Sequence, residues 1–398
     1  MKKTLVALAA LAATASFAQT SITIYGNLDQ GIYRQTDNGN SYSKIASNVN
    51  STSTLGFRGV EDLGGGNTAG FHLLSELSLP EGQVGSTTSG DAAPNAGQKN
   101  NLFTRAANIY FTNKDIGSFE IGRIQDVVWQ TQGAFGNTGS NSFGWAAYTA
   151  TQTNFGALVS QGMGTAPADK TFSATTFNAA AAAYTPSVQN NAQSGSAPIN
   201  FNAGWGFKTA NISGFQLTYQ HVGNNFQQAN GSASIAASQG SALRLEYTNG
   251  PLNLQYAQTQ RQDASDYQGA KWKVMGATYQ MGAAKLVAAQ SKLTTGNGFA
   301  SIDGNTVTGL GVIYDISPMV DVAAGYTTIK DDKLGQSASV LGFTGRYKFT
   351  KRTQVYAGYG KENQDSALKV TMLYGGPAST STAGAGSTGY LVGIRHSF

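Results

Sequence analysis

Histidine is the scarcest of the residues in this sequence that could perform acid–base chemistry. Its three copies, His72, His221 and His396, lie in segments that are far apart along the chain, and cysteine is absent. A hydrolase needs a nucleophile, a base and an orienting group held together, and no Gly-x-Ser-x-Gly elbow occurs to provide one. We therefore expect that the protein is not an enzyme.

Metal and phosphate sites are also poorly supported. Close carboxylates occur in "RQDASD" (261–266) and "KDDK" (330–333), between regions of regular alternation, where loose Ca²⁺ binding competes with a simple solvated loop. The glycine-rich "EDLGGG" (61–66) precedes an alternating stretch instead of a helix, which is typical of a turn and not of a phosphate loop. The sequence therefore predicts no metal and no cofactor.

The composition indicates which kind of fold must carry the polar residues of this chain. Gly 50, Tyr 18 and Phe 19 accompany only 12% charged residues, about half the usual charged share of a soluble protein. No apolar run reaches the length of a membrane-spanning helix. The net charge of +5 includes Lys2 and Lys3 of an N-terminal leader, so no basic patch suggests nucleic acid.

Apolar and polar residues alternate with a period of two from one end of the chain to the other. In "SITIYGNLDQGIYR" (21–34) Ile22, Ile24 and Ile32 alternate with Asn27 and Asp29, which indicates a strand with one apolar face. The same pattern returns in "SALRLEYTNG" and in "SVLGFTGRYKFT". An all-β protein is expected.

The connections between these strands alternate between two kinds. Short ones fall at 61–67, 113–118, 209–214, 249–252, 280–285, 316–319 and 349–353. Long ones, rich in Gly, Ser, Asn and Thr, fall near 35–50, 80–100, 126–145, 163–199, 223–240, 262–270, 293–305, 330–336 and 362–387. This is an up-and-down meander, tight at one edge and loose at the other.

A meander of this length must close, because open twisted sheets rarely exceed about ten strands. Closure also leaves no unpaired edge in a bilayer, with apolar residues facing lipid and polar residues facing a wet lumen. The sequence therefore predicts a transmembrane antiparallel β-barrel. A secreted soluble sandwich or solenoid is the alternative, but it does not explain the two kinds of connection.

The two ends of the chain fit this interpretation. "MKKTLVALAALAATASFA" has the charged, apolar and small-residue regions of a secretory signal peptide, so we expect cleavage after Ala18 and a barrel over 19–398. The closing stretch "TGYLVGIRHSF" (388–398) alternates like a strand. One of its faces is formed by Tyr390, Val392, Ile394, His396 and Phe398.

Several pieces, in order, resemble the Gram-negative outer-membrane general porins, particularly the betaproteobacterial group. They are "SITIYGNLDQGI", "LGFRGVEDLGGG", "GSFEIGR", "YTNGPL", "FTKRTQVYAGY" and "VGIRHSF". The resemblance implies sixteen strands, short periplasmic turns, long extracellular loops and a third loop folded into the lumen. Eighteen strands is the alternative if "TATQTN" (149–154) is another tight turn.

The resemblance also implies partners and location. The protein is expected in the outer membrane of a Gram-negative bacterium, among lipid and lipopolysaccharide, as a homotrimer. In this family the barrel-assembly machinery reads the terminal strand, which pairs with the first strand to close the barrel, so Phe398 is expected to lie in the wall.

Porins of this family oppose wall arginines to acidic residues on the inward loop. The matching wall positions here are Arg105, Arg58 and Thr54, where Thr54 replaces an arginine. The matching loop positions are Asp126, Ala134, Phe135 and Gly136, where Ala134 replaces a glutamate. His72, Glu76 and Arg123 are alternative sources of charge, whereas Arg244 is expected farther from the loop.

These residues predict a channel for passive diffusion of small hydrophilic solutes and ions with a weak preference for anions. Arg105 and Arg58 are expected to carry the fixed charge, and the charge-poor loop is expected to oppose it with none. A plugged structural or adhesive barrel that acts through its surface loops is the alternative.

Overall fold

The computed structural model describes residues 21–37, 40–84, 102–136, 200–222, 239–262, 271–294, 305–331, 336–365 and 386–398. The predicted signal peptide and "TATQTN" lie outside these ranges, so the cleavage after Ala18 stays a prediction. Within the described ranges no helix is long and apolar enough to cross a membrane.

Strands make up almost all of the described chain. They are β1 (Ser21–Asp37), β2 (Asn40–Ser47), β3 (Thr54–Gly64), β4 (Asn67–Ser78), β5 (Gln83–Val84), β6 (Ala106–Asn113), β7 (Gly117–Gln125), β8 (Asn200–Thr209), β9 (Phe215–Val222), β10 (Gln239–Asn249), β11 (Leu252–Gln262), β12 (Lys271–Met281), β13 (Ala284–Thr294), β14 (Asn305–Ser317), β15 (Val320–Asp331), β16 (Gln336–Lys348), β17 (Thr353–Gln364) and β18 (Ser387–Ser397). One helix, α2 (Val127–Gly136), follows β7.

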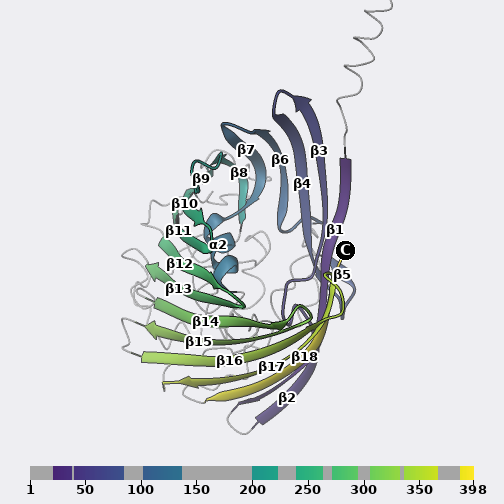
Figure 1. The fold of residues 1–398 in the computed structure, drawn as a ribbon, viewed down its shortest axis with the longest axis vertical. Helices are drawn as coiled ribbons and strands as arrows, with labels where there is room; N and C mark the ends of the chain where they lie inside the picture. Colours follow the sequence, from purple (N-terminus) through teal and green to yellow (C-terminus); the bar gives the residue numbers. More distant parts are fainter. Residues whose placement is uncertain are drawn as a thin grey trace, which may run out of the picture.

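The strands form a closed antiparallel barrel (Figure 1). β2 and β3 both pair with β1, through Ile45 opposite Ile32 and Phe57 opposite Ile24, so they are two halves of one wall strand. β5 has two residues and pairs only with the last two residues of β4, Leu77 and Ser78. Counting β2 with β3 and leaving out β5 gives sixteen wall strands, which confirms the predicted number.

The alternative of eighteen strands is excluded by the pairing around the third loop. β7 pairs directly with β8, from Gly117 opposite Thr209 to Gln125 opposite Asn200. β7 also pairs with β6 and β8 with β9, so both edges of each strand are taken. No further strand stands between β7 and β8.

The ring closes where β1 meets β18, as the resemblance to the general porins implies. Asn27 lies opposite Ser397 and Asp37 opposite Ser387. The pairing continues to the last residue, because the Phe398 amide donates to the Gly26 carbonyl (3.1 Å) and the Gly26 amide donates to the Phe398 carbonyl (3.2 Å).

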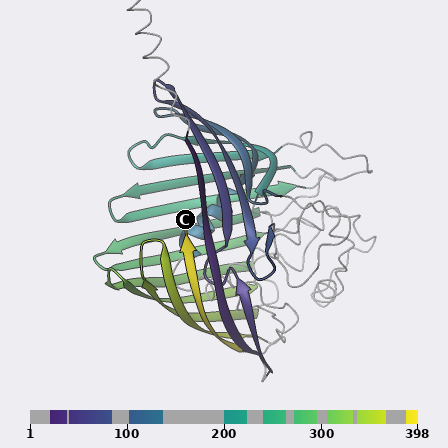
Figure 2. The ribbon, with the colours of Figure 1, turned by 90° about the vertical axis from the view of Figure 1, so that its right-hand side faces the viewer.

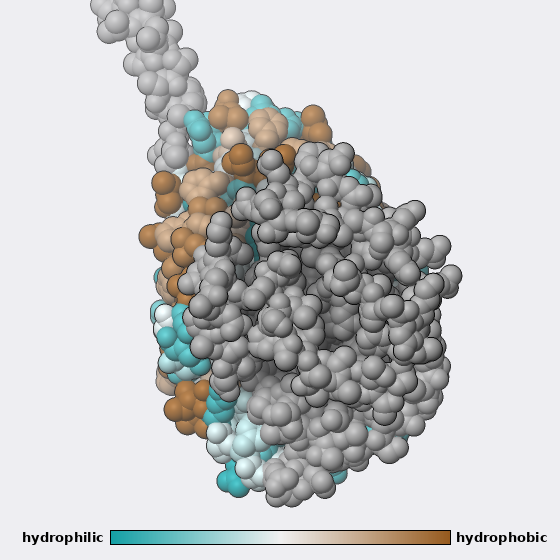
Figure 3. Space-filling view, turned by 180° about the vertical axis from the view of Figure 1, so that it is seen from behind, coloured by the Kyte–Doolittle hydropathy of each residue, from teal (hydrophilic) through white to brown (hydrophobic). Residues whose placement is uncertain are grey.

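The alternation sorts the side chains between the two faces of the wall. Ile22 is 68% exposed on the outer face, whereas Asp29 of the same strand is 0% exposed on the inner face. Hydrophobic side chains accordingly gather on the flank of the barrel at the left of Figure 3. The outer face is therefore apolar enough to contact lipid.

The tight turns gather at one end of the barrel, as Figure 2 shows. They include the predicted turns at 61–67, 113–118 and 249–252. The expected long loop at 35–50 is wrong: β1 continues to Asp37 and β2 begins at Asn40. These ends of β1 and β2 are polar, so apolar alternation did not reveal them, although their backbones pair in full.

Candidate functional site

The third loop enters the barrel as a helix, and α2 lies inside the ring of strands (Figure 1). Its first turn is capped by Asp126, whose Oδ1 accepts a hydrogen bond from the Val128 amide (2.8 Å). An aspartate before a helix satisfies amides that have no partner within the helix. Asp126 is 0% exposed, so its carboxylate stabilises the loop and does not face open water.

The start of α2 is fixed to β9, the strand that follows β8 in the wall. The Val127 amide donates to Gln220 Oε1 (3.0 Å), and Gln220 Nε2 donates to the Gln125 carbonyl (2.7 Å). A buried apolar cluster surrounds this point, formed by Ile124, Val127, Phe201, Val222 and Ala242. The loop therefore leaves the wall in one defined direction.

The middle of α2 rests on the wall strand β10. Arg244 Nη1 donates to Gln130 Oε1 of the helix at 3.1 Å. The expectation that Arg244 lies far from the third loop is therefore wrong. Because Gln130 and Arg244 are 114 positions apart in the sequence, sequence spacing gave no indication of this contact.

The end of α2 is seated on β12 through Phe135, which is 1% exposed. A Cβ added to Gly276 would lie 2.8 Å from two ring atoms of Phe135, so only glycine leaves room for the ring. Ala134, next to it, is exposed, and Gly136 ends the helix. The predicted loop tip thus divides into an anchor, Phe135, and an exposed small residue, Ala134.

Arg105 does not stand as an isolated cation on the wall. Its Nε and Nη2 both donate to Glu76 Oε2, at 3.0 and 2.6 Å, and both side chains are buried. The guanidinium carbon also lies 5.7 Å from the ring centroid of Trp129 in α2. Arg105 therefore joins the wall at β4 to the inward helix, and a carboxylate neutralises much of its charge.

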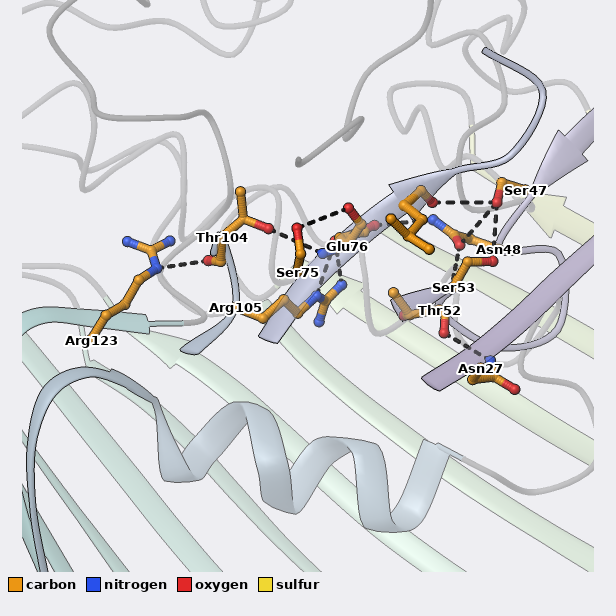
Figure 4. A network of polar contacts seen from close by, with 11 residues as sticks. Asn27, Ser47, Asn48, Thr52, Ser53, Ser75, Glu76, Thr104, Arg105 and Arg123 are labelled. Carbon is orange, nitrogen blue, oxygen red and sulfur yellow. Dashed lines mark hydrogen bonds and ion pairs between the residues drawn. The ribbon is translucent and has the colours of Figure 1, made fainter. Parts of the chain in front are cut away.

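The other carboxylate oxygen of Glu76, Oε1, binds residues 48–53, a bend in the wall that Figure 4 shows together with Arg105. Asn48 Nδ2 donates to Glu76 Oε1 (3.0 Å), and Asn48 Oδ1 accepts from the Ser53 amide (2.6 Å). Asn48 has φ of 66°, a left-handed conformation that asparagine tolerates better than most residues. Residues 48–53, the break between β2 and β3, are thereby fixed against the inner wall.

The bend 48–53 is also bonded to the closing seam. Asp29 Oδ1 accepts hydrogen bonds from the Asn50 amide (3.0 Å) and from Tyr356 Oη of β17 (2.9 Å). Asn27 Nδ2 donates to Ser51 Oγ (3.0 Å). A continuous polar chain therefore runs from β17 through Asp29, the bend and Glu76 to Arg105 beside α2.

Arg58 and Thr54 occupy the inner face of β3. Arg58 is exposed, and its guanidinium carbon lies 5.4 Å from the ring centroid of Tyr25. Within the described ranges no carboxylate forms an ion pair with Arg58. Thr54 lies opposite Glu76 in the β3–β4 pairing. Of the predicted wall cations, Arg58 is thus the accessible one.

Carboxylates on the inner side are mostly buried in hydrogen-bonded networks. Five are at most 1% exposed, namely Asp29, Glu76, Asp126, Asp321 and Glu362. Glu76 is paired with Arg105, and Asp321 is paired with Arg346 and Lys348, so these cations offset much of the negative charge that the two carboxylates would present to the channel water. Among the described residues of the inner face, the charged side chains that reach the channel water are therefore mainly cations such as Arg58.

The sequence indicated some of these residues and missed others. The resemblance to the general porins pointed to Arg105, Arg58 and the start of the third loop, but nothing in the sequence singled out Asn48 or the bend 48–53. The only signal was the cluster "SNVNSTS" (47–53) between two alternating stretches, which is typical of an irregular segment. Among the described residues no group of His, Asp or Glu could hold a metal ion.

Comparisons with known proteins agree with this geometry. The family model described as "Gram-negative porin" matches residues 4–367. Outer membrane porin protein 32 of Delftia acidovorans is 28% identical, over 100% of both chains. In structure, the anion-selective porin from Comamonas acidovorans has a TM-score of 0.67 at 22% identity, covering 96% of this chain and 100% of that one. The trimer form of OmpT, an outer membrane protein of Vibrio cholerae, has a TM-score of 0.55 at 13% identity, covering 95% of this chain and 99% of that one.

Proposed function

Because the chain belongs to the Gram-negative porin family and is an outer-membrane channel instead of an enzyme, we propose that it conducts small hydrophilic solutes and ions by passive diffusion, with a weak preference for anions. The observation that carries the preference is the contrast between exposed Arg58 and the buried carboxylates of the inner face.

Screening explains why the preference is weak. The Debye length is about 8 Å at physiological salt and about 30 Å at 0.01 M. An exposed cation on the wall therefore acts on ions that pass nearby but not across a wide lumen. Arg105 adds little to this field, because Glu76 lies within hydrogen-bonding distance of it.

Planar lipid bilayers provide the test. Insertion of the purified protein should give discrete conductance steps, and a KCl gradient should give a reversal potential that favours chloride. The preference should grow as the salt concentration falls. A clear preference for potassium at low salt would overturn the proposed selectivity, and the absence of conductance steps would favour the plugged adhesive barrel.

The proposed assembly is a homotrimer, inserted by the barrel-assembly machinery and surrounded by lipid and lipopolysaccharide. The similarity in fold to OmpT of Vibrio cholerae, which has a trimer form, supports it. Extraction in mild detergent without heating should give an oligomer that resists SDS and dissociates on boiling. A monomer under the same extraction would contradict a trimer.

A further inference from the structure

The wall strand formed by β2 and β3 contains more residues than its pairing with β1 uses. β2 ends at Ser47, opposite Gln30, and β3 begins at Thr54, opposite Asn27. Only residues 28 and 29 of β1 lie between these two pairs, whereas the six residues of the bend 48–53 lie between Ser47 and Thr54. The strand therefore carries four residues more than a continuous pairing needs.

The even number of extra residues keeps both halves of the strand in phase. Successive side chains of a strand point to opposite faces, so an odd number would turn the apolar residues of one half toward the lumen. Ile45 of β2 lies opposite Ile32, and Phe57 of β3 lies opposite Ile24, and both isoleucines of β1 are exposed on the outer face. The bend therefore leaves the sheet without disturbing the apolar outer face.

The extra residues are displaced toward the lumen. Asp29 and Asn27 are two positions apart in β1, so both belong to its inner face. Asp29 Oδ1 accepts a hydrogen bond from the Asn50 amide (3.0 Å). Asn27 Nδ2 donates to Ser51 Oγ (3.0 Å) and to the Thr52 carbonyl (2.9 Å). Because side chains of the inner face hold it, the bend projects from the wall into the barrel.

Hydrogen bonds at both ends fix the bend in place. Ser53, which is 0% exposed, accepts a hydrogen bond at its Oγ from the Asp29 amide (3.0 Å). The side chain of Asn48 bonds to Glu76 Oε1 (3.0 Å) and to the Ser53 amide (2.6 Å). The tip, Ser51 and Thr52, is the half-buried part of the bend. The bend is therefore a fixed projection with an accessible tip.

The bend lies at the same level of the barrel as α2. Glu76, which accepts from Asn48 of the bend, also accepts from Arg105 (Figure 4). The guanidinium carbon of Arg105 lies 5.7 Å from the ring centroid of Trp129 in α2. Two wall side chains thus connect the two inward elements, so both narrow the lumen at one depth.

We propose that the bend 48–53 is a second constricting element of the channel, which acts beside the third loop and limits the size of the solutes that pass. The proposal rests on the conduction proposed above. The bend, "NVNSTS", contains no charged residue, so it restricts passage by volume and by its amide and hydroxyl groups. The preference between anions and cations is left to charged residues such as Arg58.

A deletion that restores a continuous strand provides the first test. Removal of residues 49–52 leaves Asn48 and Ser53 to pair with Asp29 and Leu28 and keeps the alternation of both halves. In planar bilayers the single-channel conductance should rise above the wild-type value, because the narrowest cross-section becomes wider. The largest poly(ethylene glycol) that enters the channel should also become larger.

A second variant tests the bend with the length of the chain unchanged. The sequence contains no cysteine, so Thr52→Cys introduces a single thiol at the tip. Its reaction with an uncharged, bulky methanethiosulfonate reagent should lower the single-channel conductance by volume alone. Thr350→Cys is the matched control, because Thr350 is exposed in a tight turn. Mass spectrometry should show that both thiols react, and the control should keep its conductance.

The two measurements separate this proposal from the proposed function. Absence of conductance steps in the wild type would contradict the channel itself. If the wild type conducts, either an unreactive thiol in Thr52→Cys or a modified thiol that leaves the conductance unchanged would overturn the second constriction. A folded deletion variant with wild-type conductance would overturn it as well, and should the deletion variant not fold, the thiol at residue 52 decides.

Discussion

Glu76 and Arg105 form a buried ion pair in which Arg105 Nη2 lies 2.6 Å from Glu76 Oε2, with side chains 2% and 6% exposed. The two oxygens of Glu76 accept hydrogen bonds from different partners: Oε2 accepts from Arg105, and Oε1 accepts from Asn48 of the bend 48–53. One carboxylate thus fixes the bend 48–53 and the cation that covers Trp129 of α2. The charge of the channel wall and the position of the inward helix are coupled through it.

Glu76→Gln should raise the preference for anions, because it leaves the Arg105 charge without its counter-charge while preserving the size of the side chain. The reversal potential in a KCl gradient should shift toward that of chloride, more at 0.1 M than at 1 M salt. Glu61→Gln is the matched control, since Glu61 is exposed near a tight turn. An unchanged reversal potential for Glu76→Gln would show that Glu76 does not influence permeating ions.

Arg58→Ala should reduce the preference for anions more than alanine substitution of any other arginine in the described part of the wall. Arg58 is exposed and has no ion pair among the described residues, so its full charge acts on the lumen. The effect should be largest in dilute salt, because screening hides it at about 1 M. Lys114→Ala, in a tight turn and paired with Asp115, should change the reversal potential little. Equal effects of the two variants would count against this role of Arg58.

Gly276→Ala should disturb the seat of α2, because the new methyl group would lie 2.8 Å from the Phe135 ring. Phe135→Ala should free the same end of the helix, since removal of a buried Phe side chain costs about 3–5 kcal/mol of local packing. Single-channel recordings should show more current noise and more closures in both variants. Gly345→Ala is the control, because an added Cβ there meets nothing within 4 Å. Quiet recordings from both variants would mean that Phe135 does not hold the loop.

Phe398→Ser should lower the amount of folded barrel in the outer membrane while leaving the conductance of the surviving channels unchanged. The ring of Phe398 packs over Gly26 at the seam, where the backbones of both residues are paired. The amount of heat-modifiable barrel measures assembly. Phe349→Ser, an exposed aromatic residue outside the seam, is the control. If both variants assembled as well as the wild type, the prediction would fail.

The sequence determined the wall of this protein. Alternation such as that of Ile22 and Ile24 with Asn27 and Asp29 assigns each residue to a face, because successive side chains of a strand point to opposite sides. Turn residues set the tight connections, and length together with the need to pair every edge required closure. These are local rules, and they predicted an all-β meander that closes. The sixteen strands, the seam at Phe398 and the inward third loop were implied by the resemblance to the general porins, and the structure has the sixteen strands and the seam.

The tertiary structure decided what lies inside the wall. The pairing of Glu76 with Arg105, the contact of Arg244 with Gln130 and the seat of Phe135 on Gly276 join residues that are 29, 114 and 141 positions apart. No periodic pattern encodes such contacts, because closure of the barrel brings these strands together and the direction of the loop is set by Gln220 and Asp126. Charge in the lumen depends on these contacts. Whether an arginine acts on passing ions is decided by the carboxylate that folding places beside it, since attraction between buried charges is strong only at short range and low dielectric.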